Sequence, residues 1–336
     1  MRVRNGLQGC RIVQTAENRT VSLKAIDGLT AGLEIRTTGP ASIEAQAVAA
    51  AVGRLLDAAR AGMRCRSDAS AAPGAPVSIG AAGPTGESFD GVSITRIRAF
   101  YPIVRSKLGG LDLAVVTSER GDSVDPDAIR AAAAYATRFE RRRIHVVAGD
   151  ELDVDALQAR HPELDFIVMP VAKLIGRFAA GRNEAEVVVA PPEFATILTE
   201  VAGVLSGAAT LATVTRFSAA GITVEAASHG DEDMPAVRPS ALILAAADLL
   251  VWLGRSQPAA RIVNGWARTL EHGCHTAEFS VLSPYSRQLD ADEFAEVVAS
   301  RLGEQPRALQ LRQPGTDRQK PRTTGSHLRL VSRSDG

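Results

Sequence analysis

The stretch AEVVVAPPEFATILTE, from Ala185 to Glu200, decides the fold of this chain. Its first part, VVVA at Val187 to Ala190, is a β-branched run typical of a buried strand, and the two prolines that follow interrupt it. From Phe194 to Leu205 the apolar residues recur at helical spacing. The stretch therefore predicts a strand, a turn and a helix, a unit from which α/β proteins are built.

The composition of the chain is that of a globular protein. It has 336 residues, of which 45% are hydrophobic, so it can bury a large core in one or two domains. Its formal net charge is zero, which gives no basic field for nucleic acid or an anionic membrane. The apolar run from Ala241 to Gly254 is interrupted by Asp248 and is shorter than the ~20 residues that a bilayer span needs. We expect no nucleic-acid partner and no membrane association.

Three features bear on the compartment and on the ends of the chain. The cysteines Cys10, Cys65 and Cys274 are widely spaced, as expected of free thiols in a reducing cytoplasm. No proper apolar segment follows the first arginines, so no signal peptide is predicted. Residues 305–336 are polar and rich in arginine, proline and glycine, which predicts a disordered tail.

Further blocks follow in the order of a known family. DLAVV at Asp112 to Val116 precedes a helix-and-strand pattern at Ala128 to Val147, and VEAASHGDEDMPAVRPSALILAAADLLVWLG occupies Val224 to Gly254. With the opening stretch, these blocks resemble the β-decarboxylating dehydrogenases, the isocitrate and isopropylmalate dehydrogenase family. The resemblance extends from Asp112 to Leu302, whereas the family's GDGIGPE signature is absent.

The resemblance implies an α/β, isopropylmalate-dehydrogenase-like fold with two intertwined domains. Residues 10–98 and 209–304 would form domain 1, the degenerate nucleotide-binding side, and residues 99–208 would form domain 2, the side of dimerisation and substrate. The helices at Ala172 to Phe178 and Phe194 to Leu205 would pair across a homodimer. Both are rich in small and aliphatic residues, which suits a buried interface.

The family holds a divalent metal with three aspartates, and this sequence departs from that pattern. The two aspartates of the family's GDILSD motif match Thr196 and Glu200, and a third, from its VDA motif, matches Ala172. Hard cations need several carboxylate oxygens in fixed geometry. One carboxylate among three positions predicts that no metal is bound.

The resemblance also implies an eroded acid and base. Ala148 lies at or near the position of the family's catalytic lysine, and Thr117 lies at the position of the arginine in its REN motif. No tyrosine occurs in the loop after Thr117, and Tyr135 in the next helix is expected to be a packing residue. Without these groups, proton transfer in oxidative decarboxylation lacks both partners.

The arginines that would bind substrate carboxylates are better preserved. The segment GVSITRIRAFYPIVRSKLGG contains Ser93, Arg96, Arg98 and Arg105, and planar guanidinium groups match carboxylates bidentately. The alternative is a solvated edge strand with Arg96 and Arg98 on one face. Lys173 adjoins the lost metal position and either neutralises a carboxylated ligand in place of the cation or is a surface lysine.

The nucleotide site is half present. His229 matches the family histidine that packs on adenine, or is an ordinary turn residue, and Arg238 replaces the asparagine of the family's ANPTALI segment. We expect no cofactor, with NAD(P) as the alternative.

Three functions remain open. The first is a repurposed non-redox catalyst or binder of a small carboxylate or phosphate in a specialised pathway, its ligand held by Arg105 with Arg96 or Arg98. In that case Glu200 and Glu119 would be the groups able to compensate the arginines. The second is a non-catalytic regulatory subunit, in a hetero-oligomer with an active family member. The third is an NAD(P)-dependent oxidoreductase acting on a 2-hydroxy acid.

Overall fold

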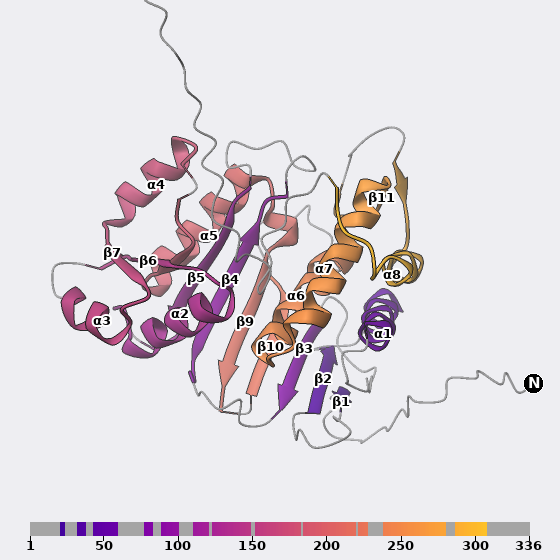
Figure 1. Ribbon diagram of the computed structural model, residues 1–336, viewed down its shortest axis with the longest axis horizontal. Coiled ribbons are helices and arrows are strands. Elements are labelled where there is room, and N and C mark those ends of the chain that lie inside the picture. The colour runs from indigo at the N-terminus through magenta and orange to yellow at the C-terminus, as the bar shows by residue number, and fades with distance from the viewer. Residues whose placement is uncertain are drawn as a thin grey trace, which may run out of the picture.

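A mixed sheet of ten strands, in the order β1-β2-β3-β10-β9-β4-β5-β8-β6-β7, runs through the whole molecule (Figure 1). The computed structural model describes residues 21–23, 32–37, 43–59, 77–82, 89–100, 110–120, 123–148, 152–182, 184–219, 221–227, 238–279 and 286–307. The strands are β1 (Val21–Leu23), β2 (Gly32–Thr37), β3 (Val77–Ala82), β4 (Val92–Arg98), β5 (Asp112–Ser118), β6 (Arg143–Val146), β7 (Asp165–Val168), β8 (Val187–Val189), β9 (Thr213–Ser218) and β10 (Gly221–Ala226).

Most of the helices cover the two faces of this sheet. They are α1 (Ile43–Ala58), α2 (Pro126–Arg138), α3 (Val154–Arg160), α4 (Val171–Ala179), α5 (Pro192–Ser206), α6 (Pro239–Trp252), α7 (Ser256–Glu271) and α8 (Ala291–Ser300). A 3-10 turn (Ala209–Leu211) precedes β9, and β11 (Cys274–His275) pairs with β12 (Arg287–Gln288) in a separate ribbon.

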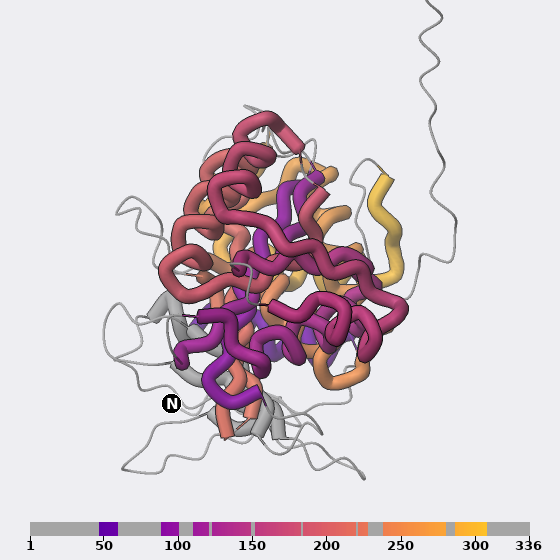
Figure 2. Tube along the Cα trace, turned by 90° about the vertical axis from the view of Figure 1, so that its left-hand side faces the viewer, coloured from indigo at the N-terminus to yellow at the C-terminus, as the bar shows by residue number. Residues whose placement is uncertain are grey.

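The sheet has a parallel part and an antiparallel part. Strands β5, β8, β6 and β7 are parallel, with Ala114 opposite Val187 and Ile144 also opposite Val187. On the other side of β5, β4 is antiparallel to both β5 and β9. Figure 2 views the molecule from the end of the sheet formed by β6 and β7, with the segment from α2 to α4 nearest the viewer.

Side chains along each strand alternate between the two faces of the sheet, so each face has its own hydrophobic core. Ile94 and Val116 point to the face covered by α2, α6 and α7, whereas Ile97 and Val115 point to the face covered by α4 and α5. Figure 1 shows α6 and α7 crossing the first face. Every residue of α6 from Ser240 to Trp252 is buried. That helix therefore lies at the centre of the fold.

Local sequence signals explain where two of these helices begin and end. Asp125 caps α2 by accepting a hydrogen bond of 2.8 Å from the backbone N–H of Asp127, and Pro126 occupies the first turn. Pro192 likewise opens α5, and Gly207 closes it with a φ of 64°, a left-handed conformation that favours glycine.

The expected α/β class and the elements of the opening stretch are confirmed. The strand predicted at Val187 to Ala190 is β8, and the helix predicted from Phe194 begins slightly earlier, at Pro192. One sheet runs through both predicted domains, whose boundaries stay a prediction. Most of the predicted tail, residues 308–336, lies outside the described residues.

Within the described part of the chain, no helix has the length and apolar character needed to cross a membrane.

Candidate functional site

The positions at which the chain departs from the family pattern gather at one edge of the sheet. Strands β5, β8, β6 and β7 are parallel, so their carboxyl ends meet there, where ligands of α/β sheets bind. Backbone hydrogen bonds from Val147 to Val189 (2.8 Å) and from Ala190 to Val116 (3.0 Å) join these ends. We call this the C-terminal edge. It carries Thr117, Ala148, Ala172 and Thr196.

The described side chains of this edge include few groups that could bind a metal ion or transfer a proton. The hydroxyl of Thr196 donates to the carbonyl of Pro192 in its own helix (3.1 Å). The buried hydroxyl of Thr117 has no hydrogen-bond partner in the described part of the chain. Glu200 is half-buried, and Lys173 is exposed in the first turn of α4. Among the residues that the structure describes, no group of three or more His, Cys, Asp or Glu side chains could hold a metal ion.

Strand β4 separates the predicted substrate residues. Ser93 is opposite Thr117 of β5 and lies on the face of α4 and α5. Arg96 and Arg98 point to the opposite face, near Asp112 at the start of β5. The structure therefore places Ser93 towards the C-terminal edge and the two arginines towards the other edge. Arg105 lies outside the described residues.

The interpretation of β4 as a solvated edge strand is wrong. The strand lies between β9 and β5 near the middle of the sheet, and Arg96 and Arg98 are only 6% and 4% exposed. Their location on one face of the strand is confirmed, since both donate to Asp248 of α6. Buried guanidinium groups require partners, and the structure supplies carboxylates from two elements.

The ion-pair cluster has a defined geometry. Arg96 binds both carboxylate oxygens of Asp112 through Nε and Nη2, at 2.9 Å each, and donates through Nη1 to Asp248 at 2.6 Å. Arg98 binds both oxygens of Asp248, at 3.2 and 3.0 Å. Arg141, after α2, donates to Asp112. Such bidentate, charge-assisted pairs are the strong ones.

The pKa values of the cluster follow from burial and proximity. Burial alone would raise the pKa of Asp112, but the guanidinium groups of Arg141 and Arg96 hold it well below its usual value. Burial lowers the pKa of Arg98, an effect that Asp248 offsets and Arg96 reinforces. Burial therefore disfavours the charged form of the Arg98 side chain, and the carboxylate of Asp248 favours it.

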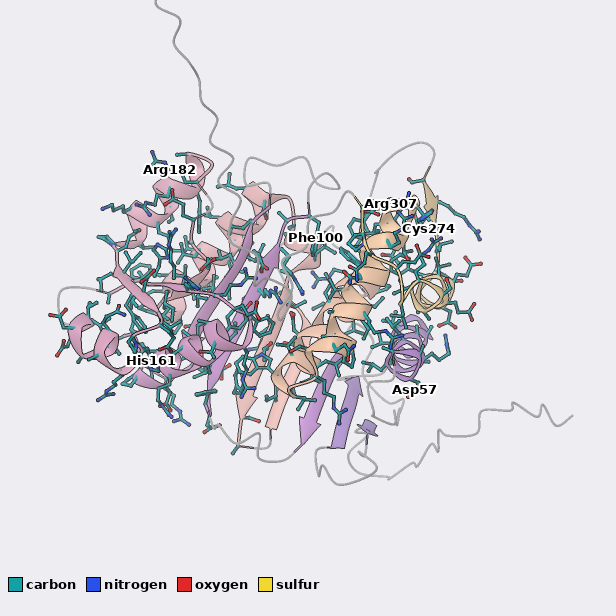
Figure 3. The ribbon with its side chains drawn as sticks, viewed as in Figure 1. Asp57, Phe100, His161, Arg182, Cys274 and Arg307 are labelled. Carbon is teal, nitrogen blue, oxygen red and sulfur yellow. The ribbon has the colours of Figure 1, made fainter. Side chains whose placement is uncertain are left out.

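A cavity of about 260 Å³ opens beside this cluster. We call it the arginine cavity. Its charged wall contains Arg96, Arg98 and Arg141, and its apolar wall contains Phe100, which follows β4 and is labelled in Figure 3. The ring of Phe100 packs against Trp266 of α7, with centroids 4.8 Å apart. The cavity thus lies between the sheet and α7.

Arg96 and Arg98 are not compensated by Glu200 or Glu119, the two groups considered from the sequence. Their partners are Asp112 and Asp248, and Glu119 instead pairs with Arg216 of β9 at 3.3 Å. The packing role expected of Tyr135 is confirmed: it is 2% exposed, and its ring stacks on Phe139 with centroids 4.2 Å apart.

Of the two predicted nucleotide residues, His229 lies outside the described residues, and Arg238 is buried. Arg238 precedes α6 and donates to the carbonyl of Ala227. Glu278 accepts a hydrogen bond of 2.6 Å from the backbone N–H of Ser240, so a carboxylate occupies the N-terminus of α6. Burial raises the pKa of Glu278.

Sequence reasoning missed three members of the cluster, Asp112, Arg141 and Asp248. A signal for Asp248 was present, because it is the only charged residue within the otherwise apolar α6. A charge in a fully apolar helix predicts a buried partner. Arg141 lies in the run RRR between a helix and a strand, a pattern typical of the surface.

Comparison with known proteins gives relatives of one kind. The chain is 26% identical over 194 residues to the isocitrate dehydrogenase [NADP] of Rickettsia conorii, covering 54% of this chain and 40% of that protein. It is 30% identical over 127 residues to that of Rickettsia prowazekii, covering 37% of this chain and 26% of that protein. The chain thus spans less than half the length of these relatives, and no family model matches it.

Solved structures share the fold. Isocitrate dehydrogenase from Methylococcus capsulatus superposes with a TM-score of 0.60 at 17% identity, covering 79% of this chain and 98% of that one. The TT0538 protein from Thermus thermophilus gives a TM-score of 0.52 at 19% identity, covering 68% of this chain and 54% of that one. The chain is thus related, at low sequence identity, to the isocitrate and isopropylmalate dehydrogenase family.

Proposed function

We propose that this protein is a redox-silent relative of isocitrate dehydrogenase that binds a small anionic ligand. The observation that carries the proposal is the contrast between the two edges of the sheet. The C-terminal edge has Thr117, Ala148, Ala172 and Thr196 at positions where the family has charged groups. The other edge has three buried arginines beside a cavity.

Redox silence follows from the chemistry of the C-terminal edge. Oxidative decarboxylation needs a cation to stabilise the developing enolate and a proton donor to quench it. Threonine and alanine side chains supply neither a metal ligand set nor a titrating group near neutral pH. Lys173 is exposed on α4 and provides a positive charge without a base. No metal and no nicotinamide cofactor form part of this proposal.

Anion binding follows from the charge of the cluster. Three buried arginines, Arg96, Arg98 and Arg141, contact two aspartates, Asp112 and Asp248, so the ion-pair cluster itself has one more cation than anion, whereas the whole lining of the cavity, with Arg143, Glu184 and Glu186, is balanced. Burying an excess of cations is costly, and an anion bound near the cluster lowers that cost.

Turnover assays and ligand-induced stabilisation test the proposal together. The purified protein, given isocitrate, isopropylmalate or tartrate with NAD or NADP and Mg²⁺, should form no reduced nicotinamide above background. The melting temperature should rise with at least one small carboxylate, because a ligand that binds only the native state stabilises it. It should not rise with NAD, NADP or Mg²⁺. Robust metal-dependent turnover would contradict the proposed redox silence. An unchanged melting temperature with every anion would contradict the proposed binding of a small anionic ligand.

A non-catalytic subunit is the second candidate, and one observation favours it. Ile197 and Val204 of α5 are 46% and 74% exposed, and they lie on one side of the helix. Large exposed apolar side chains on one face indicate a protein interface. A second copy of this chain or an active relative of it would cover that face. Light scattering of the protein alone separates these cases: a homodimer supports the first, and a monomer that assembles only with an active relative supports the second.

A further inference from the structure

His145 is a buried histidine of strand β6, on the face of the sheet that α4 and α5 cover. The residue is 1% exposed, and it lies opposite Ile167 of β7 and Val188 of β8. These two aliphatic side chains belong to the hydrophobic core that also contains Leu174 and Phe178 of α4. The histidine therefore lies in the layer between the sheet and α4.

One ring nitrogen of His145 lacks a partner. Within the described residues, Nδ1 is buried and makes no hydrogen bond. A neutral imidazole can leave Nδ1 without a hydrogen, whereas the protonated ring carries an N–H on both nitrogens. Protonation would therefore bury an N–H group at Nδ1 with no acceptor, which is costly. The surroundings of Nδ1 thus favour the neutral ring.

The charged groups around His145 also oppose its protonation. Arg177 of α4 and Arg143 of β6 are cations that act on the ring. The carboxylates that act on it are Glu184 and Glu186, before β8. Both carboxylates also bind other donors: Glu184 pairs with Arg177 at 3.4 Å, and Glu186 accepts from two backbone N–H groups at and before the start of β6, at 3.0 and 3.1 Å. A protonated ring would face two guanidinium groups whose counterions are shared.

The pKa of His145 follows from this environment. Burial lowers it from the usual value of 6.5, Arg177 and Arg143 lower it further, and the two glutamates offset part of the effect. Two more charged groups on the adjoining elements, Asp165 of β7 and Lys173 of α4, are exposed, where water screens them. The folded protein therefore holds the ring neutral.

We propose that His145 is a pH-sensitive switch that controls how firmly α4 packs on the sheet. While the ring is neutral, α4 packs over it. A proton that binds the ring when α4 opens stabilises the open state. Because α4 also carries Ala172 and Lys173, the switch acts on the C-terminal edge, and it operates whether or not a ligand is bound.

The direction and range of the pH dependence follow from linkage. In the closed state the pKa of His145 lies below 6.5. When α4 opens, water reaches the ring and its pKa returns to the usual value. The packing of α4 is therefore at full strength above that value. It weakens as the pH falls below it, until the pKa of the closed state is reached.

Hydrogen exchange of the full chain, measured by mass spectrometry at about pH 7.5 and about pH 5.5, tests the switch. After correction for the intrinsic exchange rate, the protection of the α4 amides should fall about tenfold at the lower pH. That pH lies about one unit below the usual pKa, so the open state gains the proton and the closed state does not. The amides of α2, on the opposite face of the sheet, should change less. Equal protection of α4 at both pH values would overturn the proposal.

Three variants assign the effect to the ring. His145→Gln keeps a polar side chain that cannot be protonated, and should remove the pH dependence at α4. His272→Gln is the matched control, because His272 is exposed after α7 on the other face, and should leave the tenfold loss intact. Arg177→Gln removes the cation that acts most strongly on the ring, so it should raise the pKa of His145 and reduce the loss. A loss in His145→Gln as large as in the unaltered protein would refute the switch.

A titration of the unaltered protein decides the question even if His145→Gln does not fold. The chain has six histidines, so an NMR spectrum of the protein labelled at histidine Cε1 contains few signals. The signal that Arg177→Gln shifts most belongs to His145. It should titrate below pH 6.5 in the unaltered protein and at a higher pH in Arg177→Gln. A pKa of His145 at or above 6.5 in the unaltered protein would rule out the proposal.

Discussion

Asp248 of α6 and Arg96 of β4 lie 2.6 Å apart although 152 residues separate them in the sequence. The same carboxylate binds Arg98 and accepts a hydrogen bond of 3.0 Å from the hydroxyl of Thr213 on β9. One buried aspartate therefore joins the central helix to two adjacent strands. This contact both fixes α6 on the sheet and sets the charge of the arginine cavity.

Replacing Asp248 should strongly destabilise the protein. Asp248→Asn keeps the shape of the side chain but leaves Arg96 and Arg98 with one carboxylate between them. Removing one partner of a buried ion pair costs about 3–5 kcal/mol of unfolding free energy. Urea denaturation followed by circular dichroism measures this loss. Glu293→Gln is the control, since its pair with Arg287 is 53% and 72% exposed and should contribute less than about 1 kcal/mol.

Acid should weaken the fold through Asp112. Its pKa in the folded protein lies below the ordinary value of 3.8, so its ionised form stabilises the native state at neutral pH. That contribution is fully present above the ordinary pKa and is lost as the pH falls through it towards the folded value. Asp112→Asn should be less stable at neutral pH, with a shallower dependence on pH below about pH 4. Urea titrations at several acidic pH values check this. A dependence as steep as that of the unaltered protein would contradict it, and Asp155→Asn on exposed α3 serves as the control.

The local units of this fold were predictable, and their long-range charge pairs were not. The run VVVA followed by two prolines is sufficient for β8 and α5, because β-branched residues, proline and helical spacing act over a few residues. Arg96 and Arg98 were correctly placed on one face of β4. Their burial depends on Asp248, whose position opposite β4 follows only from the topology of the sheet.

The sequence near β4 also could not show that the predicted substrate residues point to opposite faces of the strand. Ser93 and Arg96 are close in the sequence, so a single binding segment was the natural expectation. The pleat of β4 sends them to opposite faces, and helices packed on each face of the sheet bury both side chains. A pattern of alternating arginines is compatible with a solvated strand or a buried charge cluster, and the position of β4 in the sheet together with the helix packed on its face decides between the two.

The exposed face of α5 should hold two copies of the chain together. Ile197→Asp combined with Val204→Asp places charges on that face and should convert a dimer into a monomer, because burying unpaired carboxylates is unfavourable. Light scattering measures the mass. Ala159→Asp, on the exposed side of α3, adds a charge elsewhere and should leave the mass unchanged. A monomer in the unaltered protein, or a dimer that survives both aspartates, would contradict the prediction.

Restoring one carboxylate at the C-terminal edge should not restore metal binding. Thr196→Asp adds an acid on α5 one helical turn before Glu200, and threonine and aspartate have similar helix propensities, so the fold should persist. Mg²⁺ nevertheless requires near-octahedral oxygen ligands, and Ala172 on α4 still offers none. Catalytic groups that act as a unit also restore little activity when only one of them is put back. The variant should therefore show no Mg²⁺-dependent rise in melting temperature and no turnover of isocitrate with NADP. Metal-dependent reduction of the nucleotide by Thr196→Asp would mean that the remaining groups of the edge are competent, and redox silence would then rest on that residue alone.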